Sequence, residues 1–205
     1  MVCWKKIAIT VLFGACASHS VIAAECGDPP PKQIEIDLWS TRTLLSPDQQ
    51  WQFTSVGPMS SERKAQLYIE NFHRSKRWRV GSIWRDGTVF WSEDSKRLFL
   101  MDEYAADDTK IRVFDVTGEV PREIRGLDRV IRHSLFSRVP RDESTFWLIY
   151  PQVCFASNDS STIIVVADAP LVRNVGYGPA RPFGKKLTVD LRSLRVVNSE
   201  PATPK

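Results

Sequence analysis

Few residues in this sequence have the types and spacing that catalysis requires. Beyond residues 1–24 the histidines are His73 and His133. His73 lies in the basic stretch 72–78, which is typical of a solvated turn between two strands, and His133 lies off the apolar stripe of an expected helix. The sequence contains no HExxH motif, no paired-cysteine metal motif, no GxSxG and no phosphate-binding loop. We therefore expect a protein that is not an enzyme and that holds no cofactor or metal.

Carboxylates are concentrated in one segment, Asp102 to Asp108. Calcium takes several carboxylate oxygens at once, so this segment is a candidate calcium loop. Its carboxylates lack the alternate-position spacing of calcium-binding loops, which favours a solvated loop at the edge of a sheet. Asp102 and Asp168 occupy equivalent places after two repeated apolar runs. A hydrolase acting on polysaccharide would need such a pair, although turn chemistry alone also favours aspartate there.

Three long polar segments offer surfaces for a protein partner: Gly57 to Ala65, Asp102 to Thr109 and Arg173 to Lys186. The third contains tyrosine and arginine among glycines, a combination typical of contact surfaces. If the three segments lie on one rim of the fold, the candidate anchors for a partner are Met59, Tyr104, Tyr177 and Arg181.

Residues 1–24 have the features of a secretory signal peptide. Lys5 and Lys6 supply a positive start, Ile7 to Ala17 is a short apolar core, and small residues at 21–24 allow cleavage. The core is far shorter than the ~20 residues that cross a bilayer, so no membrane span is expected. We expect a periplasmic protein. Lipid anchoring at Cys16 is the alternative, although Phe13 stands where the lipoprotein motif has leucine.

Export has two consequences for the rest of the chain. Cys26 and Cys154 remain as a pair, which an oxidising compartment favours as a disulfide bond; two unpaired buried thiols are the alternative. Loss of Lys5 and Lys6 leaves 26 basic residues against 24 acidic ones, a net charge of +2. A nucleic-acid partner is therefore not expected.

The elements that position these residues follow a pattern that occurs three times. Ser46-Pro47-Asp48, Ser92-Glu93-Asp94 and Ser157-Asn158-Asp159 each precede an apolar run, a loop and a second strand-like stretch. Serine and aspartate suit tight turns because their side chains bond to nearby backbone. Repetition at this scale indicates stacked supersecondary units. We expect one domain over residues 25–205, with antiparallel repeats at 44–84, 87–125 and 145–198.

Two segments lie outside this pattern. Ile34 to Trp39 alternates between apolar and polar residues, which predicts a strand before the first repeat. Leu127, Ile131 and Leu135 fall at helical spacing before Pro140. This spacing predicts a short amphipathic helix over 127–138 that caps an open end of the sheets.

The second repeat carries a family resemblance. Phe90 to Leu100, followed by Lys110 to Val116, resembles one blade of the Tol-type and WD-like β-propeller repeats, which read Ser-Pro-Asp-Gly-Lys before an apolar strand. In the first repeat Gln49 stands where many blades have glycine, and Trp51 comes one residue early. The resemblance implies an all-β fold, an incomplete three-bladed β-propeller-like array of antiparallel sheets around a pseudo-threefold axis, with one short helix. Closed propellers have about 4–8 blades, so this array is open or is completed by a second copy of the chain.

An incomplete ring exposes sheet faces and edges, which proteins cover or use for binding. Small exported proteins with three propeller-like sheets resemble, in architecture, the periplasmic immunity proteins that neutralise type VI secreted peptidoglycan amidases. This resemblance implies a non-catalytic inhibitor whose partner is another periplasmic protein, such as a secreted cell-wall amidase. The alternatives are a propeller that binds or hydrolyses polysaccharide and a Tol-like envelope scaffold.

Overall fold

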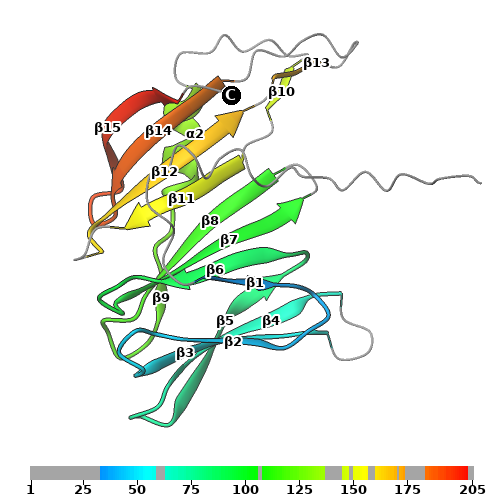
Figure 1. The fold of residues 1–205 in the computed structure, drawn as a ribbon, viewed down its shortest axis with the longest axis vertical. Coiled ribbons are helices and arrows are strands. Elements are labelled where there is room, and N and C mark those ends of the chain that lie inside the picture. Colours follow the sequence, from blue (N-terminus) through cyan, green and yellow to red (C-terminus); the bar gives the residue numbers. More distant parts are fainter. Residues whose placement is uncertain are drawn as a thin grey trace, which may run out of the picture.

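The computed structural model describes residues 33–58, 63–105, 108–136, 145–147, 150–156, 160–169, 171–173 and 183–202. Over these residues the chain is nearly all antiparallel β-sheet with one helix (Figure 1). The three larger sheets follow one another along the long axis, so the first and the third lie at opposite ends. The expected all-β, incomplete propeller-like array is confirmed. Its three larger sheets follow one another in an open row, and the expected arrangement around a pseudo-threefold axis is not seen (Figure 1).

The first sheet has four strands that pair in chain order: β2 (Arg42–Leu45), β3 (Trp51–Val56), β4 (Ala65–Asn71) and β5 (Lys76–Ile83). Buried and half-buried residues alternate along β4, as expected for a sheet that packs on one face. In β5, Val80 is an extra residue in the pairing, because Leu67 faces Gly81 while Tyr68 faces Arg79. The carbonyl of Val80, on this bulge, accepts a hydrogen bond from Arg112 of the second sheet at 3.1 Å.

The second sheet has the order β1 (Gln33–Ile36), β6 (Gly87–Trp91), β7 (Arg97–Ala105), β8 (Asp108–Asp115) and β9 (Arg122–Glu123). The predicted strand Ile34 to Trp39 is therefore shorter than expected, and it pairs with β6 of the second sheet. It ends at Ile36 because the Asp37 carboxylate accepts hydrogen bonds from the backbone N–H groups of Trp39 and Ser40, which turns the chain.

The acidic segment Asp102 to Thr109 is mostly strand. β7 continues to Ala105 and β8 begins at Asp108, so Asp102 pairs with Lys110 inside a hairpin. The strand continues because Asp102 lies on the same face as Leu98 and Leu100, where its charge meets the guanidinium of Arg112. The expectation of a solvated loop is therefore wrong for residues 102–105 and 108–109, which lie in strands.

The third sheet pairs β11 (Tyr150–Ala156), β12 (Thr162–Ala169), β14 (Phe183–Asp190) and β15 (Arg195–Ala202), beside a ribbon of β10 (Thr145–Trp147) and β13 (Leu171–Arg173). Helix α2 (Leu127–Phe136) buries Leu127, Ile131 and Leu135 against β8 and the third sheet. It lies between two sheets, so the expected capping of an open end is wrong. The outer strand β9 is only two residues long, and the helix contacts β8 of the same sheet. Among the described residues, no helix combines the length and apolarity needed to cross a membrane.

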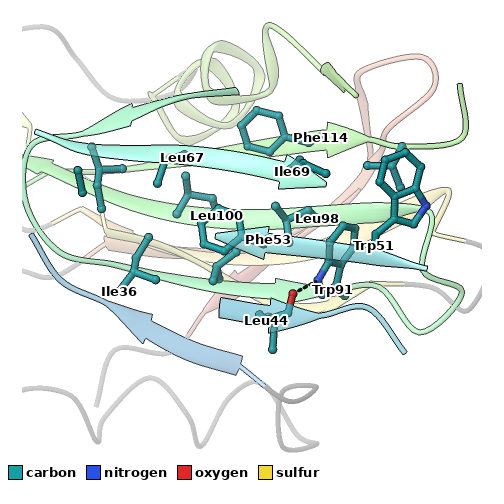
Figure 2. Close-up of a cluster of buried hydrophobic side chains, with 14 residues drawn as sticks. Ile36, Leu44, Trp51, Phe53, Leu67, Ile69, Trp91, Leu98, Leu100 and Phe114 are labelled. Atoms are coloured by element: carbon teal, nitrogen blue, oxygen red, sulfur yellow. Dashed lines mark hydrogen bonds between the residues drawn. The ribbon is translucent and has the colours of Figure 1, made fainter. Parts of the chain in front are cut away.

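Two apolar clusters hold the row of sheets together. One fills the space between the first and second sheets, where Phe53 and Ile69 face Leu98 (Figure 2). Within this cluster the indole Nε1 of Trp91 donates to the carbonyl of Leu44 at 3.1 Å. The other cluster lies between the second and third sheets and includes the helix. Each large apolar side chain buried there contributes about 1.5–3 kcal/mol, so packing between sheets is a main source of stability.

The first two Ser-x-Asp segments form the same turn. The N–H of Ser46 donates to the carbonyl of Trp51 at 2.9 Å, and that of Ser92 donates to the carbonyl of Arg97 at 2.8 Å. The residue after the aspartate has a left-handed backbone in each of the three repeats: Gln49 (φ 59°), Ser95 (φ 60°) and Ser160 (φ 49°). This conformation favours glycine, which many propeller blades have at this position. Trp51 thus occupies the place of Arg97, and the first repeat is not shifted.

The outward face of the first sheet is polar where the equivalent faces of the other sheets are apolar. From the turns, Gln52 and Thr54 of β3 correspond to Leu98 and Leu100 of β7. In the third sheet the corresponding residues are Ile163 and Val165, and all four apolar residues are buried between sheets. The first sheet therefore ends the row, as a capping repeat with a polar outer face does in repeat proteins.

Candidate functional site

The residues that sequence reasoning proposed as partner anchors have no described side chains. These are Met59, Tyr104, Tyr177 and Arg181, of which only Tyr104 has a described backbone, in β7. The proposed disulfide cannot be located either, because Cys26 lies outside the described residues and only the backbone of Cys154, in β11, is described. The anchors and the disulfide both stay predictions.

The histidines and the paired aspartates are not brought together. His73 is exposed in the turn between β4 and β5, and His133 is exposed on α2. Asp102 lies in β7 of the second sheet and pairs with Gly87, whereas Asp168 lies in β12 of the third sheet. Within the described residues, no cluster of histidine, cysteine, aspartate and glutamate has the geometry to hold a metal ion.

Several hairpin strands have their ends on one side of the molecule. In Figure 1 the end of β3 and the start of β4 are at the right of the view, as are the end of β7 and the start of β8, and the turns that precede β3 and β7 are on the other side. The last residues of β12 and the first residues of β14 lie on the same side as these strand ends. Two hollows of the described surface lie beside β1.

A polar groove opens there between the edges of the first two sheets. In the described residues β1 and β2 are terminal strands of their sheets, and both line the groove. Its larger part, about 650 Å³, lies between β1 and residues 41–43. Its smaller part, about 450 Å³, lies between β1, Arg42, residues 86–88 after β5, and Glu103 of β7.

Carboxylates dominate the charge of this groove. Asp37 Oδ2 lies 3.6 Å from Nη2 of Arg42, so these two charges offset each other. Hydrogen bonds from the Ser40 hydroxyl and from the N–H of Trp39 lower the pKa of Asp37, which keeps it ionised. The other carboxylates, those of Glu35, Asp86 and Glu103, form no ion pair with a described residue. The groove therefore has a negative potential at neutral pH.

Trp39 lies in the turn between Asp37 and Thr41, two residues that line the groove, and is 84% exposed. Its turn is fixed by Asp37, which accepts from the N–H of Trp39 at 2.7 Å, from the N–H of Ser40 at 2.7 Å and from the Ser40 hydroxyl at 2.6 Å. The turn also packs closely on Gly57, where a Cβ would lie 2.9 Å from the carbonyl oxygen of Leu38. The indole is thus held out in solvent by a backbone that is itself fixed.

A second tryptophan follows β5 on the same side. Trp84 is 53% exposed, and the ammonium of Lys64 lies 3.8 Å from the centre of one of its rings. Sequence reasoning singled out neither Trp39 nor Trp84. The available signal for Trp39 was the sequence Asp37-Leu38-Trp39-Ser40, because aspartate three residues before serine is typical of a side-chain-closed turn.

A buried ionic network lies between the first two sheets. The Arg112 guanidinium contacts Glu123 twice, at 2.9 and 3.2 Å, and its Nη1 lies 3.8 Å from Asp102 Oδ2. Its Nη2 also donates to the carbonyl of Val80, on the bulge of the first sheet, at 3.1 Å. Burial raises the pKa of Asp102 to about 6, against the opposing effect of Arg112. Arg112 therefore joins the outer strand of one sheet to the middle of the next.

No family model matches the sequence, and no curated protein matches it. Solved structures with partial likeness include the Pyrococcus horikoshii acylaminoacyl peptidase, at 13% identity and a TM-score of 0.42 over 82% of this chain and 25% of that one. A putative TolB from Agrobacterium tumefaciens matches at 12% sequence identity and a TM-score of 0.33, over 79% of this chain and 48% of that one. An oligogalacturonate lyase in complex with manganese matches at 15% sequence identity and a TM-score of 0.34, over 83% of this chain and 50% of that one. The chain thus spans between a quarter and a half of the length of these proteins.

Proposed function

We propose that this protein is exported to the periplasm and acts there by stoichiometric binding of another protein, not by catalysis. The partner we propose is a secreted peptidoglycan-degrading enzyme, which the protein neutralises as an immunity protein. The observation that carries the proposal is Trp39, an exposed indole on a fixed turn beside a groove. Aromatic side chains held in this way commonly anchor protein interfaces, where their truncation costs about 2 kcal/mol or more.

The surroundings of Trp39 support a binding surface on this side of the molecule. Trp84 lies on the same side, and the groove offers the edges of β1 and β2, which a partner can contact through its backbone. The outward face of the first sheet is polar, so we place the binding surface at the groove and not at the end of the row.

The test is a titration of a secreted cell-wall hydrolase, chosen from any that is encoded beside this gene, with the purified mature protein. We expect inhibition that ends at a one-to-one ratio. Trp39→Ala weakens the complex at least about tenfold, by the magnitude typical of a central aromatic anchor. Phe72→Ala is the matched control, because Phe72 is 44% exposed but lies in the turn between β4 and β5, on the opposite side. Absence of any complex, together with cleavage of peptidoglycan by the pure protein, would contradict the proposal.

A second candidate function is the binding of a cell-wall polysaccharide. It is favoured by the same exposed tryptophan beside carboxylates, because sugars stack on indole rings and hydrogen-bond to acids. Binding of soluble glycan fragments that is lost in Trp39→Ala, with no complex formed with the hydrolase, would select this function.

A further inference from the structure

We propose that the groove binds an extended, basic segment of the partner protein, which adds as a strand to the edge of β1 that no described strand pairs with. This inference rests on the proposed function and names the chemistry that the partner must supply. In this arrangement the partner backbone forms hydrogen bonds with β1, and Trp39 is the anchor in the turn beside the groove.

The first argument is the position of β1 in its sheet. Ile36 pairs with Gly87 and Glu35 pairs with Thr88, so one edge of β1 is bonded to β6. No strand of the described residues pairs with its other edge, which lines the groove. In an antiparallel ladder alternate residues of an edge strand leave their N–H and C=O groups unpaired, and an extended peptide satisfies them by strand addition.

The second argument is the side-chain pattern along β1. Ile34 and Ile36 point toward the apolar cluster between the first two sheets, and Glu35 is exposed on the other face. Residues of an added strand lie beside these on the same faces. A complementary segment therefore alternates apolar residues beside the isoleucines with a lysine or arginine beside Glu35. Asp86 and Glu103, whose carboxylates form no ion pair with a described residue, extend the demand for positive charge along the smaller part of the groove.

Two other occupants fit this edge less well. In a second copy of the chain, an antiparallel β1–β1 pair would bring Glu35 near Glu35, and like charges on facing strands are destabilising. The chain's own residues just before β1 include Pro29, Pro30 and Pro31, which have no N–H group to donate to a ladder. A basic segment from another protein meets neither obstacle.

The test uses the mature protein and a synthetic peptide, acetyl-Thr-Lys-Val-Lys-Val-Lys-Thr-amide, with a matched peptide that has glutamate in place of lysine. Nuclear magnetic resonance titration reports which backbone amides move. We expect the lysine peptide to shift amides of residues 33–36 and the glutamate peptide to bind at least tenfold more weakly. Glu35→Lys weakens the lysine peptide at least tenfold. Glu119→Lys, an exposed change after β8, leaves its affinity unchanged.

Strand addition is separated from simple charge attraction by N-methylation of alternate residues of the lysine peptide. Methylation of the alternate residues whose N–H groups face β1 blocks their hydrogen bonds and lowers affinity at least tenfold. Methylation of the other alternate residues, whose N–H groups face away from β1, has little effect. Equal affinity for both methylated peptides overturns the proposal, as does a concentration-dependent dimer that forms through β1. If the hydrolase binds but the peptide does not, this inference fails and the proposed function stands. If the peptide binds but the hydrolase does not, the partner is wrong and the chemistry of the groove stands.

Discussion

The hydroxyl of Ser160, in the turn of the third sheet, donates to Oδ2 of Asp94, in the turn of the second sheet, at 3.1 Å. The equivalent serine of the second sheet, Ser95, accepts from the N–H of Asp48 in the first sheet at 3.0 Å. Burial raises the pKa of Asp94, but hydrogen bonds, that of Ser160 among them, outweigh it and leave the pKa lowered. The Ser-x-Asp motif therefore closes its own hairpin and also fixes each sheet to the next.

Glycine substitutions separate the cost of the left-handed turn backbone from the value of the bond between sheets. Gln49 and Ser160 both have positive φ, but only Ser160 bonds to a neighbouring turn. We expect Gln49→Gly to change the free energy of unfolding by no more than about 1 kcal/mol, because relief of the left-handed strain offsets the added freedom of the unfolded chain. We expect the free energy of unfolding of Ser160→Gly to be about 1–3 kcal/mol lower than that of Gln49→Gly, because Asp94 and Arg97 lose a buried hydrogen-bond partner. Urea unfolding measures both, and equal values would show that the bond contributes nothing.

Replacement of Arg112 is expected to be among the most damaging single changes in the second sheet. Its side chain is 11% exposed, and Arg112→Met leaves Asp102 and Glu123 without their counter-charge, at a cost of about 3–5 kcal/mol. The matched control is Arg42→Met, because the Arg42 side chain is 54% exposed and its pair with Asp37 contributes at most about 1 kcal/mol. Both are measured by chemical unfolding. The triple variant with Asp102→Asn and Glu123→Gln should recover part of the loss, and a loss of the same size in both single variants would be evidence against the network.

The buried carboxyl of Asp102 makes stability depend on pH in a stated direction. Its pKa is about 6 in the folded protein against an ordinary 3.8, so between these values the folded protein holds a proton that the unfolded chain has released. Stability from this group is full below about pH 4 and is lost as pH rises through 6. Asp102→Asn lacks this loss, so from pH 4 to pH 7 it gains about 2 kcal/mol relative to the parent. Unfolding curves of the two proteins that stay parallel over this range would refute the assignment to Asp102.

Gly81 is required by the guanidinium that lies beside it. A Cβ at this position would lie 2.7 Å from Nη2 of Arg112, and the backbone φ of +146° disfavours any side chain. We expect Gly81→Ala to cost about 1–3 kcal/mol from the backbone, and more from the displaced Arg112. Gly118→Ala, whose nearest neighbour would be the Val120 carbonyl at 3.8 Å, should change stability by less than about 0.5 kcal/mol. In the Arg112→Met background Gly81→Ala should cost less than alone, and strict additivity would exclude the contact.

The three hairpin units could be predicted from sequence because their signals are local. A serine and an aspartate before an apolar run define a turn and the strands on either side of it, wherever the strands later pack. The pairing of β1 with β6 could not be predicted in this way, because it depends on which sheet offers an open edge after folding. Asp102 was misplaced for a similar reason. Its carboxylate is accommodated in a strand by Arg112, which approaches from the next strand.

The candidate site was harder to predict than the fold. Exposure of Trp39 follows from a turn closed by Asp37 and from the close approach of Gly57, two segments that are far apart in the sequence. Tyrosine and arginine among glycines drew attention to the segment 173–186 because composition alone favours contact there. A tryptophan in an alternating strand pattern is, by composition, a core residue, and only the end of β1 at Ile36 places it outside.

Ile36 and Gly87 lie directly opposite each other in the second sheet, although the whole first sheet separates them along the chain. In covalent terms the first sheet is an insertion into a hairpin, entering and leaving at one point. A pulling force applied to the chain before β1 would therefore act first on the β1–β6 ladder. The first sheet would carry little of that force until the ladder separated. The strand that precedes the first sheet along the chain thus becomes the mechanical fastening of the second sheet.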